Sequence, residues 1–327
     1  MTFATKDLTK RFSRFVTILL AIALGVSVHA FAAPFAFLAN SDVQSIDILD
    51  IASRSVIAQV PLKLTPTAIA INRHNTAAFI TSEKRGLIST LDVNSLEISN
   101  AMKIDGNPYA IVCDPTRERI YVSDRKRGAV HVIDTTDDSI DYVLNVGGLP
   151  VRLEINEAST RLFVLDAQSG SVTAVNLATR KLLKTIKVGD SPYDMAFAQD
   201  GDRIYVTNTI SKSISVIDVR ASKVIFTVKV GNHPYSIAHD PTLSRLVIAN
   251  RLADSLSVVN INSRREEIQI NVGAEPDGIG FVHDHREYFV INDHGKAISV
   301  INAGSLNINT TIPLPRAAQA FGTFIMQ

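Results

Sequence analysis

A repeat of 42 residues runs through most of this 327-residue chain, and it constrains the fold more than any other feature. The segments VGDSPYDMAFAQDGDRIYVTN (188–208) and VGNHPYSIAHDPTLSRLVIAN (230–250) align at this offset. A proline recurs at the same step without an insertion or deletion, at Pro66, Pro108, Pro150, Pro192, Pro234 and Pro276, and a seventh step reaches Ala318. A fixed period of this length is typical of solenoids and propellers.

Each repeat contains four short runs with the composition of β-strands. In the copy that begins at Pro108 they are YAIVC (109–113), IYVS (120–123), AVHVID (129–134) and IDYVLNV (140–146). Gly, Asp, Asn and Pro separate the runs, as expected for tight turns in an antiparallel meander. Four strands in about 40 residues are typical of one blade of a β-propeller.

An Asp or Asn stands 26 residues after each of the six anchor prolines, at the end of the third run, and a seventh stands 26 residues after position 24, one step before Pro66. The seven residues are Asp50, Asp92, Asp134, Asn176, Asp218, Asn260 and Asn302. These side chains can accept a hydrogen bond from the backbone two residues on, so we predict a tight turn at each position.

The repeat count also closes a ring. Pro34 to Gln327 is 294 residues, which is seven times 42. We therefore predict an all-β, seven-bladed β-propeller as a single domain over residues 33–327. The segment AFGTFIM (320–326) is predicted to be the innermost strand of a blade whose other three strands come from residues 35–63. Sharing one blade between both ends leaves no open sheet edge, which argues against an open solenoid.

The first 32 residues have the pattern of a secretory signal peptide. Ala30 and Ala32 form an A-x-A site after an apolar run over residues 15–28. Four bases precede that run, namely Lys6, Lys10, Arg11 and Arg14. We predict cleavage after Ala32 and a periplasmic or secreted protein. The alternative is an uncleaved anchor, which is the one membrane contact that we expect.

The net charge and the cysteine content limit the classes of function that the chain can have. Without residues 1–32 the chain has 29 basic and 31 acidic residues, a net charge of −2. This is far from the strongly basic balance of a nucleic-acid-binding domain. The single cysteine, Cys113, excludes a disulfide framework within the chain, and we expect burial to protect its thiol in an oxidising compartment.

The stretch IYVTNTISKSISVIDVRASKVIFTVKVGNHPYSIAHDP (204–241) closely resembles the consensus of YVTN-repeat β-propellers. It contains the literal sequence Tyr205-Val206-Thr207-Asn208, and other copies carry degraded forms. The resemblance covers residues 33–327 and implies an exported propeller of the YncE-like group. Similar propellers include lactonases and domains of haem d1 and copper enzymes, so the resemblance implies shape and compartment while chemistry depends on the site.

The innermost strand of each blade is expected to alternate between two roles. A large set is predicted to pack between blades, namely Ile111, Leu153, Met195, Ile237 and Ile279. Mostly small residues are predicted to face the central channel, with four polar exceptions on three consecutive blades: Arg152, Glu154, Asp194 and Ser236. Further polar and aromatic residues fall near the same anchors, at the predicted mouth: Tyr109, Tyr193, Tyr235, His233, Glu275 and Asp277. These residues form the candidate ligand-binding site.

A structural interpretation of the same residues stays open. Arg152 could simply be neutralised by Glu154 and Asp194 in an ion-pair cluster that plugs the channel, because buried charges must be paired whether or not they act. The tyrosines could be packing residues between blades.

Basic loops form a second candidate surface on the mouth face. They are Lys84-Arg85 and Arg125-Lys126-Arg127, with acidic residues interleaved. Such an arc could hold an anion or a single strand of nucleic acid, although the net charge of −2 does not favour nucleic acid. Solvated loop charges are the alternative interpretation.

Motifs for metal, redox and nucleotide chemistry are missing from the sequence. His283-Asp284-His285 is an H-x-H, but the repeat places it on a hairpin at the opposite face, without a third ligand. Neither C-x-x-C-H, G-x-S-x-G, a P-loop nor a dinucleotide fingerprint occurs. We therefore predict no cofactor and no metal site.

Two classes of function compete at this stage. The leading hypothesis is an exported, monomeric binding or scaffold protein that engages a protein, a peptide or a small anionic ligand at the mouth. The alternatives are a lactonase-like hydrolase that uses the channel carboxylates and a protein that binds anions or single-stranded nucleic acid on the basic arc.

Overall fold

The computed structural model describes residues 34–319 and 324–326, which belong to one compact unit, Ala33–Gln327. The predicted signal peptide over residues 1–32 lies outside the described residues. Among the described residues, no helix is long and apolar enough to cross a membrane.

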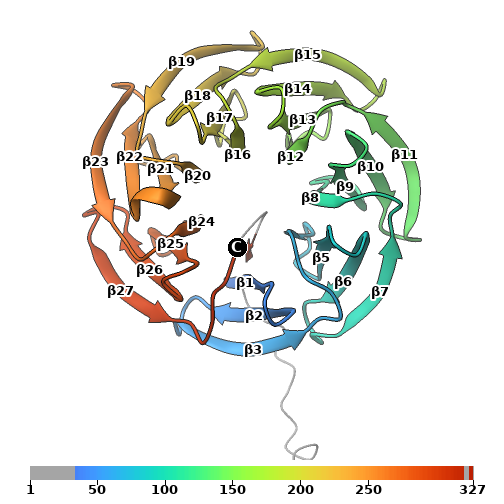
Figure 1. Cartoon of the computed structure of the whole chain (residues 1–327), viewed down its shortest axis with the longest axis horizontal. Helices are drawn as coiled ribbons and strands as arrows, with labels where there is room; N and C mark the ends of the chain where they lie inside the picture. Colours follow the sequence, from blue (N-terminus) through green and yellow to red (C-terminus); the bar gives the residue numbers. More distant parts are fainter. Residues whose placement is uncertain (1–33, 320–323, 327) are drawn as a thin grey trace, which may run out of the picture. The chain divides into compact units, whose positions relative to one another are not determined.

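Seven four-stranded antiparallel sheets form a ring in chain order, so the predicted seven-bladed propeller is confirmed (Figure 1). Blade 1 contains β1 (Phe35–Asn40), β2 (Ser45–Asp50), β3 (Ser55–Pro61) and β28 (Ile325–Met326). Blade 2 contains β4 (Ile69–Ile71), β5 (Ala77–Ser82), β6 (Leu87–Asp92) and β7 (Ile98–Lys103). Blade 3 contains β8 (Pro108–Cys113), β9 (Arg119–Asp124), β10 (Ala129–Asp134) and β11 (Ser139–Asn145).

The remaining four blades follow the same plan. Blade 4 contains β12 (Pro150–Ile155), β13 (Arg161–Asp166), β14 (Ser171–Asn176) and β15 (Lys181–Lys187). Blade 5 contains β16 (Pro192–Phe197), β17 (Arg203–Asn208), β18 (Ser213–Asp218) and β19 (Lys223–Lys229). Blade 6 contains β20 (Pro234–Asp240), β21 (Arg245–Asn250), the 3-10 turn η1 (Arg251–Ala253), β22 (Ser255–Asn260) and β23 (Arg265–Asn271). Blade 7 contains β24 (Pro276–Val282), β25 (Glu287–Asn292), β26 (Ala297–Asn302) and β27 (Ile308–Pro313).

Both ends of the propeller share blade 1, as predicted. Strand β28 pairs antiparallel with β1, and Ile325 stands opposite Ala36. A further antiparallel bridge joins Gln319 to Ala39. The described part of the predicted strand 320–326 is a strand at Ile325–Met326, while residues 320–323 lie outside the described residues.

The seven Asp and Asn residues at the ends of the third strands form the predicted turns. The backbone N–H of Thr136 donates to Asp134 Oδ1 at 2.9 Å, and that of Ala221 donates to Asp218 Oδ1 at 2.7 Å. Equivalent bonds to the side chain occur at Asp50, Asp92, Asn176, Asn260 and Asn302. Each turn is therefore stabilised by its own sequence.

The last residue of the YVTN motif has a structural role in this chain. Asn208 is fully buried, and its Oδ1 accepts the backbone N–H of Gly189 at 3.0 Å. A Cβ at Gly189 would lie 2.6 Å from Asn208 Cγ, and one at Gly148 would lie 1.9 Å from Asp166 Oδ2. The glycine before the anchor proline thus makes room for the side chain that fixes the loop.

The core lies between neighbouring blades. The predicted packing set on the innermost strands is buried, since Leu153 and Met195 are 1% and 0% exposed and Ile111, Ile237 and Ile279 are 4–5% exposed. Cys113 is half-buried, and burial raises the pKa of its thiol.

Candidate functional site

A β-bulge after the anchor proline shapes the mouth of the ring. In β12, Pro150 pairs with Asp166 and Arg152 with Leu165, so Val151 is the extra residue. Equivalent shifts occur in β8, β16, β20 and β24. A bulge turns a side chain away from the regular alternation of a strand. The residue after the proline therefore departs from the strand alternation, and in β8, β16, β20 and β24 it lines the mouth.

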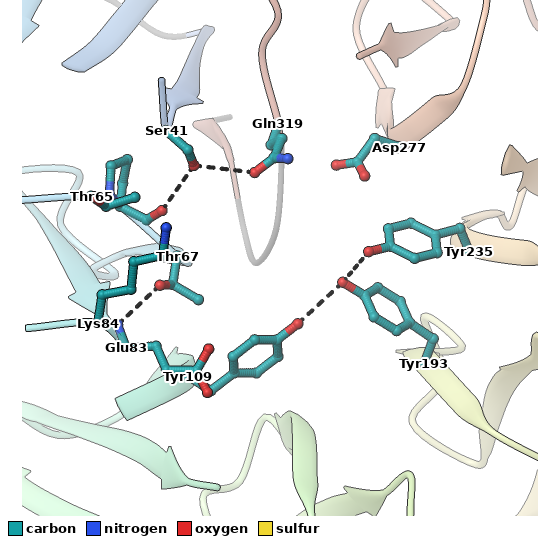
Figure 2. Close-up of a pocket in the computed structure, with 11 residues that line it drawn as sticks. Ser41, Thr65, Thr67, Glu83, Lys84, Tyr109, Tyr193, Tyr235, Asp277 and Gln319 are labelled. Atoms are coloured by element: carbon teal, nitrogen blue, oxygen red, sulfur yellow. Dashed lines mark hydrogen bonds between the residues drawn. The ribbon is translucent and has the colours of Figure 1, made fainter. Parts of the chain in front are cut away.

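This one repeat position supplies more than half of the lining of a cavity of about 230 Å³ (Figure 2). Its members are Thr67, Tyr109, Tyr193, Tyr235, Asp277 and Gln319, and the other lining residues are Ser41, Thr65, Pro66, Glu83 and Lys84. In blade 4 the same position is Val151, which is buried in the core instead. The sequence pattern gave no signal for the bulge, because it leaves the spacing of 42 residues intact.

Three tyrosine hydroxyls meet in this cavity (Figure 2). Tyr235 donates to the Tyr193 hydroxyl at 2.5 Å, and the Tyr193 and Tyr109 hydroxyl oxygens lie 3.2 Å apart. The rings of Tyr193 and Tyr235 stack with centroids 3.8 Å apart. Burial raises the pKa of all three hydroxyls, so they stay protonated at neutral pH. We name Tyr109, Tyr193 and Tyr235 the tyrosine cluster. The structure places these three predicted residues in one cavity lining, and Tyr193 and Tyr235 stack across neighbouring blades.

The two carboxylates that line the cavity are each held by an arginine. Arg125 lies 3.4 Å from Glu83 and stacks over the Tyr109 ring at 4.2 Å. Arg251 donates to Asp277 at 2.9 Å. Lys84 is the one cationic side chain in the lining, and no described carboxylate lies within salt-bridge distance of it. Arg251 is shared with Glu275 and Asp293, whereas Lys84 adds a positive charge that no described carboxylate neutralises by an ion pair.

The predicted cluster of Arg152, Glu154 and Asp194 is present but does not line this cavity. Arg152 donates to Glu154 at 3.1 Å, and its Nε lies 3.1 Å from Asp194 Oδ1. Ser236 donates to Asp194 Oδ2 at 3.1 Å. The structure therefore brings these four residues together in the ion-pair arrangement that was one of the two interpretations.

Burial sets the protonation chemistry of this cluster. Burial raises the pKa of Glu154 to about 7, with Asp194 adding to the shift and Arg152 opposing it. Burial acts against the charged form of Arg152, but Asp194 and Glu154 outweigh it and raise the pKa of Arg152. In this cluster the Arg152 guanidinium is shared between the carboxyl groups of Glu154 and Asp194, and Glu154 titrates near neutral pH.

His233 and the basic arc are the remaining predicted site residues. His233 stacks on Tyr235 with centroids 6.0 Å apart, and burial together with Arg251 lowers its pKa. In the basic arc Arg85, Lys126 and Arg127 are all exposed, and Arg127 pairs with Asp105 at 2.5 Å. The arc is therefore partly neutralised by acidic neighbours.

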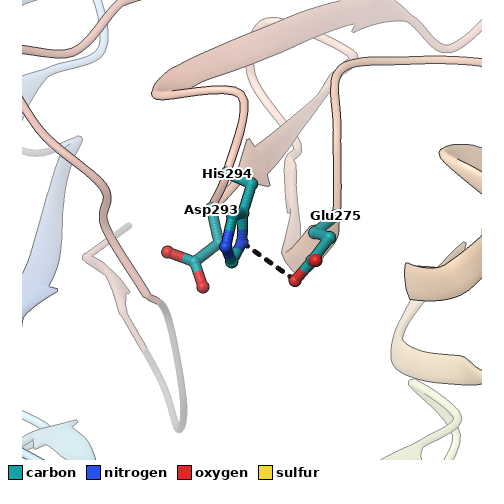
Figure 3. Close-up of side chains that lie close together, drawn as sticks. All are labelled: Glu275, Asp293 and His294. Carbon is teal, nitrogen blue, oxygen red and sulfur yellow. Dashed lines mark ion pairs between the residues drawn. The ribbon is translucent and has the colours of Figure 1, made fainter.

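A group of possible metal ligands was not predicted from the sequence. Glu275, Asp293 and His294 converge in the loops before and after β24 and β25 (Figure 3). His294 Nδ1 lies 2.9 Å from Glu275, but the Arg251 guanidinium donates to Glu275 at 2.9 Å and to Asp293 at 3.3 Å. The Arg251 guanidinium thus already pairs with both carboxylates, and its positive charge repels a metal ion. His283-Asp284-His285 lies in the turn between β24 and β25, as predicted.

Comparison with known proteins supports the fold. Residues 152–253 match the YNCE-like beta-propeller family. This segment runs from β12 to η1, so the predicted resemblance is confirmed there. The other described blades have the same four-stranded fold. No curated protein matches the chain.

Three solved structures share the architecture. Hydrazine synthase of Kuenenia stuttgartiensis is 16% identical, with a TM-score of 0.75 over 83% of this chain and 92% of that one. A functionally unknown protein from Desulfotomaculum acetoxidans is 12% identical, with a TM-score of 0.79 over 90% and 98%. Dihydro-heme d1 dehydrogenase NirN is 14% identical, with a TM-score of 0.66 over 86% and 73%. At these identities the similarity shows the fold alone.

Proposed function

We propose that this chain is an exported, non-enzymatic binding protein that holds a small organic anion in the cavity lined by the tyrosine cluster. The observation that carries the proposal is Lys84, a cation in the cavity lining that has no salt bridge to a described carboxylate, whereas Glu83 and Asp277 each contact an arginine. An anion that enters the cavity meets the ammonium group of Lys84, which has no salt-bridge partner among the described carboxylates.

Hydroxyl groups around Lys84 complete an anion site. Thr67 Oγ1 accepts the backbone N–H of Glu83 at 3.0 Å, which leaves its own hydrogen to donate to a ligand. The tyrosine hydroxyls stay protonated and can donate or accept. Charge-assisted hydrogen bonds of this kind are about twice as strong as neutral ones.

The volume limits the ligand to metabolite size. At about 230 Å³ the cavity lies below the roughly 300 Å³ at which pockets for drug-sized ligands begin. The face of the cavity that carries Tyr193 and Tyr235 is aromatic, which suits a short carbon skeleton between or beside anionic groups.

The hydrolase alternative has less support. Glu154 and Asp194 are the carboxylates that it would use, and both are engaged by Arg152 outside the cavity lining. A divalent cation there would face the Arg152 guanidinium at close range.

Calorimetric titration of the protein with acetate, succinate, citrate and inorganic phosphate at low ionic strength tests the proposal. We expect binding of at least one of these anions, about tenfold weaker in Lys84→Gln, because one charge-assisted contact is lost. Arg85→Gln is the matched control: it removes the same charge one residue away, outside the lining, and is expected to change affinity less than about twofold. Equal losses in both variants, or no binding of any probe, would contradict the proposal.

Export is tested separately. Amino-terminal sequencing of the protein purified from its own host is expected to begin at Ala33. A protein that begins at Met1 and is found in the cytoplasm would contradict this part.

A further inference from the structure

In each blade a turn joins the second and third strands. We call the residue of this turn that is equivalent to Lys84 the tip residue. At steps of 42 residues these residues are Asp42, Lys84, Lys126, Gln168, Ile210, Leu252 and His294. The turns belong to the face that holds the cavity, since Lys84 is part of its lining. Differences at this position therefore show where one part of the rim departs from the repeat.

Two neighbouring blades present aliphatic tips. Ile210 in blade 5 is 68% exposed and Leu252 in blade 6 is 60% exposed, the highest values for large hydrophobic side chains among the described residues. Single exposed hydrophobic residues are ordinary on protein surfaces. Here the two occupy the same position in adjacent blades, in turns whose usual residues are polar. The repeat thus places two exposed aliphatic side chains at equivalent positions on adjacent turns of the rim.

Two other neighbouring blades present basic tips. Lys84 in blade 2 and Lys126 in blade 3 are exposed, and exposed Arg85 follows Lys84. No ion pair to Lys84 or Lys126 occurs among the described residues. The rim thus has a basic part on blades 2 and 3 and an aliphatic part on blades 5 and 6, with Tyr109 and Tyr193 in the cavity between them.

We propose that this rim binds a polypeptide segment of another protein, which places acidic side chains on Lys126 and Arg85 and aliphatic side chains on Ile210 and Leu252. Charge complementarity favours acidic side chains at one end of the partner segment. At its other end, burial of Ile210 and Leu252 against aliphatic side chains adds apolar contact. The partner segment crosses the mouth. The two proposals concern the same mouth but rest on different residues, because Lys126, Ile210 and Leu252 do not line the cavity.

Acidic residues beside the aliphatic tips favour a polypeptide over an anionic membrane. Asp254 follows the η1 turn that carries Leu252, and the hydroxyl of Ser211, the neighbour of Ile210, donates to Asp190 Oδ2 at 3.2 Å. Both carboxylates are on exposed residues. A bilayer that received the two tips would bring these carboxylates against its anionic headgroups.

Selection of random 12-residue peptides displayed on phage against the full chain tests the proposal. We expect enriched peptides to combine Asp or Glu with Leu, Ile or Val. Synthetic copies of these peptides, measured by fluorescence anisotropy, are expected to bind the double variant Ile210→Ser, Leu252→Ser about tenfold more weakly. The matched control is Leu182→Ser, Ile268→Ser, which changes two side chains that are 49% and 47% exposed on the outer strands β15 and β23 and should leave affinity unchanged.

The contribution of the basic tip residues to peptide binding is tested separately. Lys126→Gln is expected to weaken peptide binding a few-fold and to reduce its salt dependence, whereas Lys181→Gln on β15 changes neither. Enrichment of peptides without acidic and aliphatic residues, or binding that survives the double variant, would overturn the proposal. So would absence of peptide binding together with sedimentation on phosphatidylglycerol vesicles that the double variant abolishes, which would assign the rim to a membrane.

Discussion

Two parts of the inner ring have the same backbone plan, but one carries charged and polar side chains and the other carries only glycine and alanine. On blades 4 to 6 the positions predicted to face the channel carry Arg152, Glu154, Asp194 and Ser236. On blades 7 and 2 the equivalent positions carry Gly278, Gly280, Ala68 and Ala70. The repeat therefore does not dictate the size or charge of these residues.

Ring closure explains part of the difference. A Cβ at Gly280 would lie 2.2 Å from Ile325 Cδ1 and 3.2 Å from Phe324 Cζ, so this glycine makes room for the C-terminal segment. Phe324 and Ile325 are buried, 5% and 8% exposed. The small residue serves closure of the ring, whereas the charged residues on blades 4 and 5 neutralise one another. The following predictions test this contrast.

The largest effect is expected from Arg152→Met, which leaves Glu154 and Asp194 without their shared cation. Removing one partner from a buried ion pair costs about 3–5 kcal/mol of unfolding free energy. Urea unfolding at pH 7 measures the loss. Arg73→Met is the control, because its pair with Glu118 is about one-third exposed on both sides and should cost less than about 1 kcal/mol. Similar losses in both variants would mean that the cluster is not a buried ion pair.

Glu154→Gln is expected to remove a pH dependence of stability. The pKa of Glu154 is about 7 in the folded protein against a reference of 4.5, so the folded state holds its proton more tightly. Stability therefore falls as the pH rises from about 4.5 to about 7, by roughly 2–3 kcal/mol from this group. Denaturation of the wild type and the variant across that window measures the difference. Parallel pH profiles would contradict the raised pKa.

Gly280→Ala tests the closure side of the contrast through a double-mutant cycle. We expect a loss of about 1–2 kcal/mol from overpacking against Ile325. Ile325→Val removes Cδ1, the atom in conflict, and should cost about 1 kcal/mol alone. The double variant should then lose less than the sum by about 1 kcal/mol. Strict additivity of the unfolding free energies would show that Gly280 has no role in seating the last strand.

The smallest effect is expected from Tyr193→Phe, which removes the middle hydroxyl of the tyrosine cluster. A buried hydrogen bond contributes about 1 kcal/mol, and the aromatic packing is kept. Thermal unfolding measures the change. Tyr142→Phe is the control, since the partly buried Tyr142 contacts Arg180 through its ring face rather than its hydroxyl. A larger loss in the control would argue against the tyrosine cluster as a hydrogen-bonded unit.

The repeat explains why the fold was predictable. Strand order, the seven Asx turns and the closure of blade 1 all follow from an unbroken spacing of 42 residues, because each blade forms by local pairing. Side-chain alternation also placed Ile111, Leu153 and Met195 correctly in the core.

The cavity was not predictable in the same way. A bulge after the anchor proline sends Tyr235 and Asp277 out of the alternation, and a bulge leaves no mark on the period. The group of Glu275, Asp293 and His294 was missed because its members come from two loops, and no local motif joins them.

The most direct test of the binding site uses the seven tyrosines of the chain as reporters. Three of them, Tyr109, Tyr193 and Tyr235, line the cavity, while Tyr121, Tyr142, Tyr205 and Tyr288 do not. In NMR spectra of ¹³C-tyrosine-labelled protein, titration with the anion that calorimetry identifies should shift the resonances of the three cavity tyrosines and leave the other four in place. Shifts at the other four with the cavity tyrosines unchanged would contradict the account.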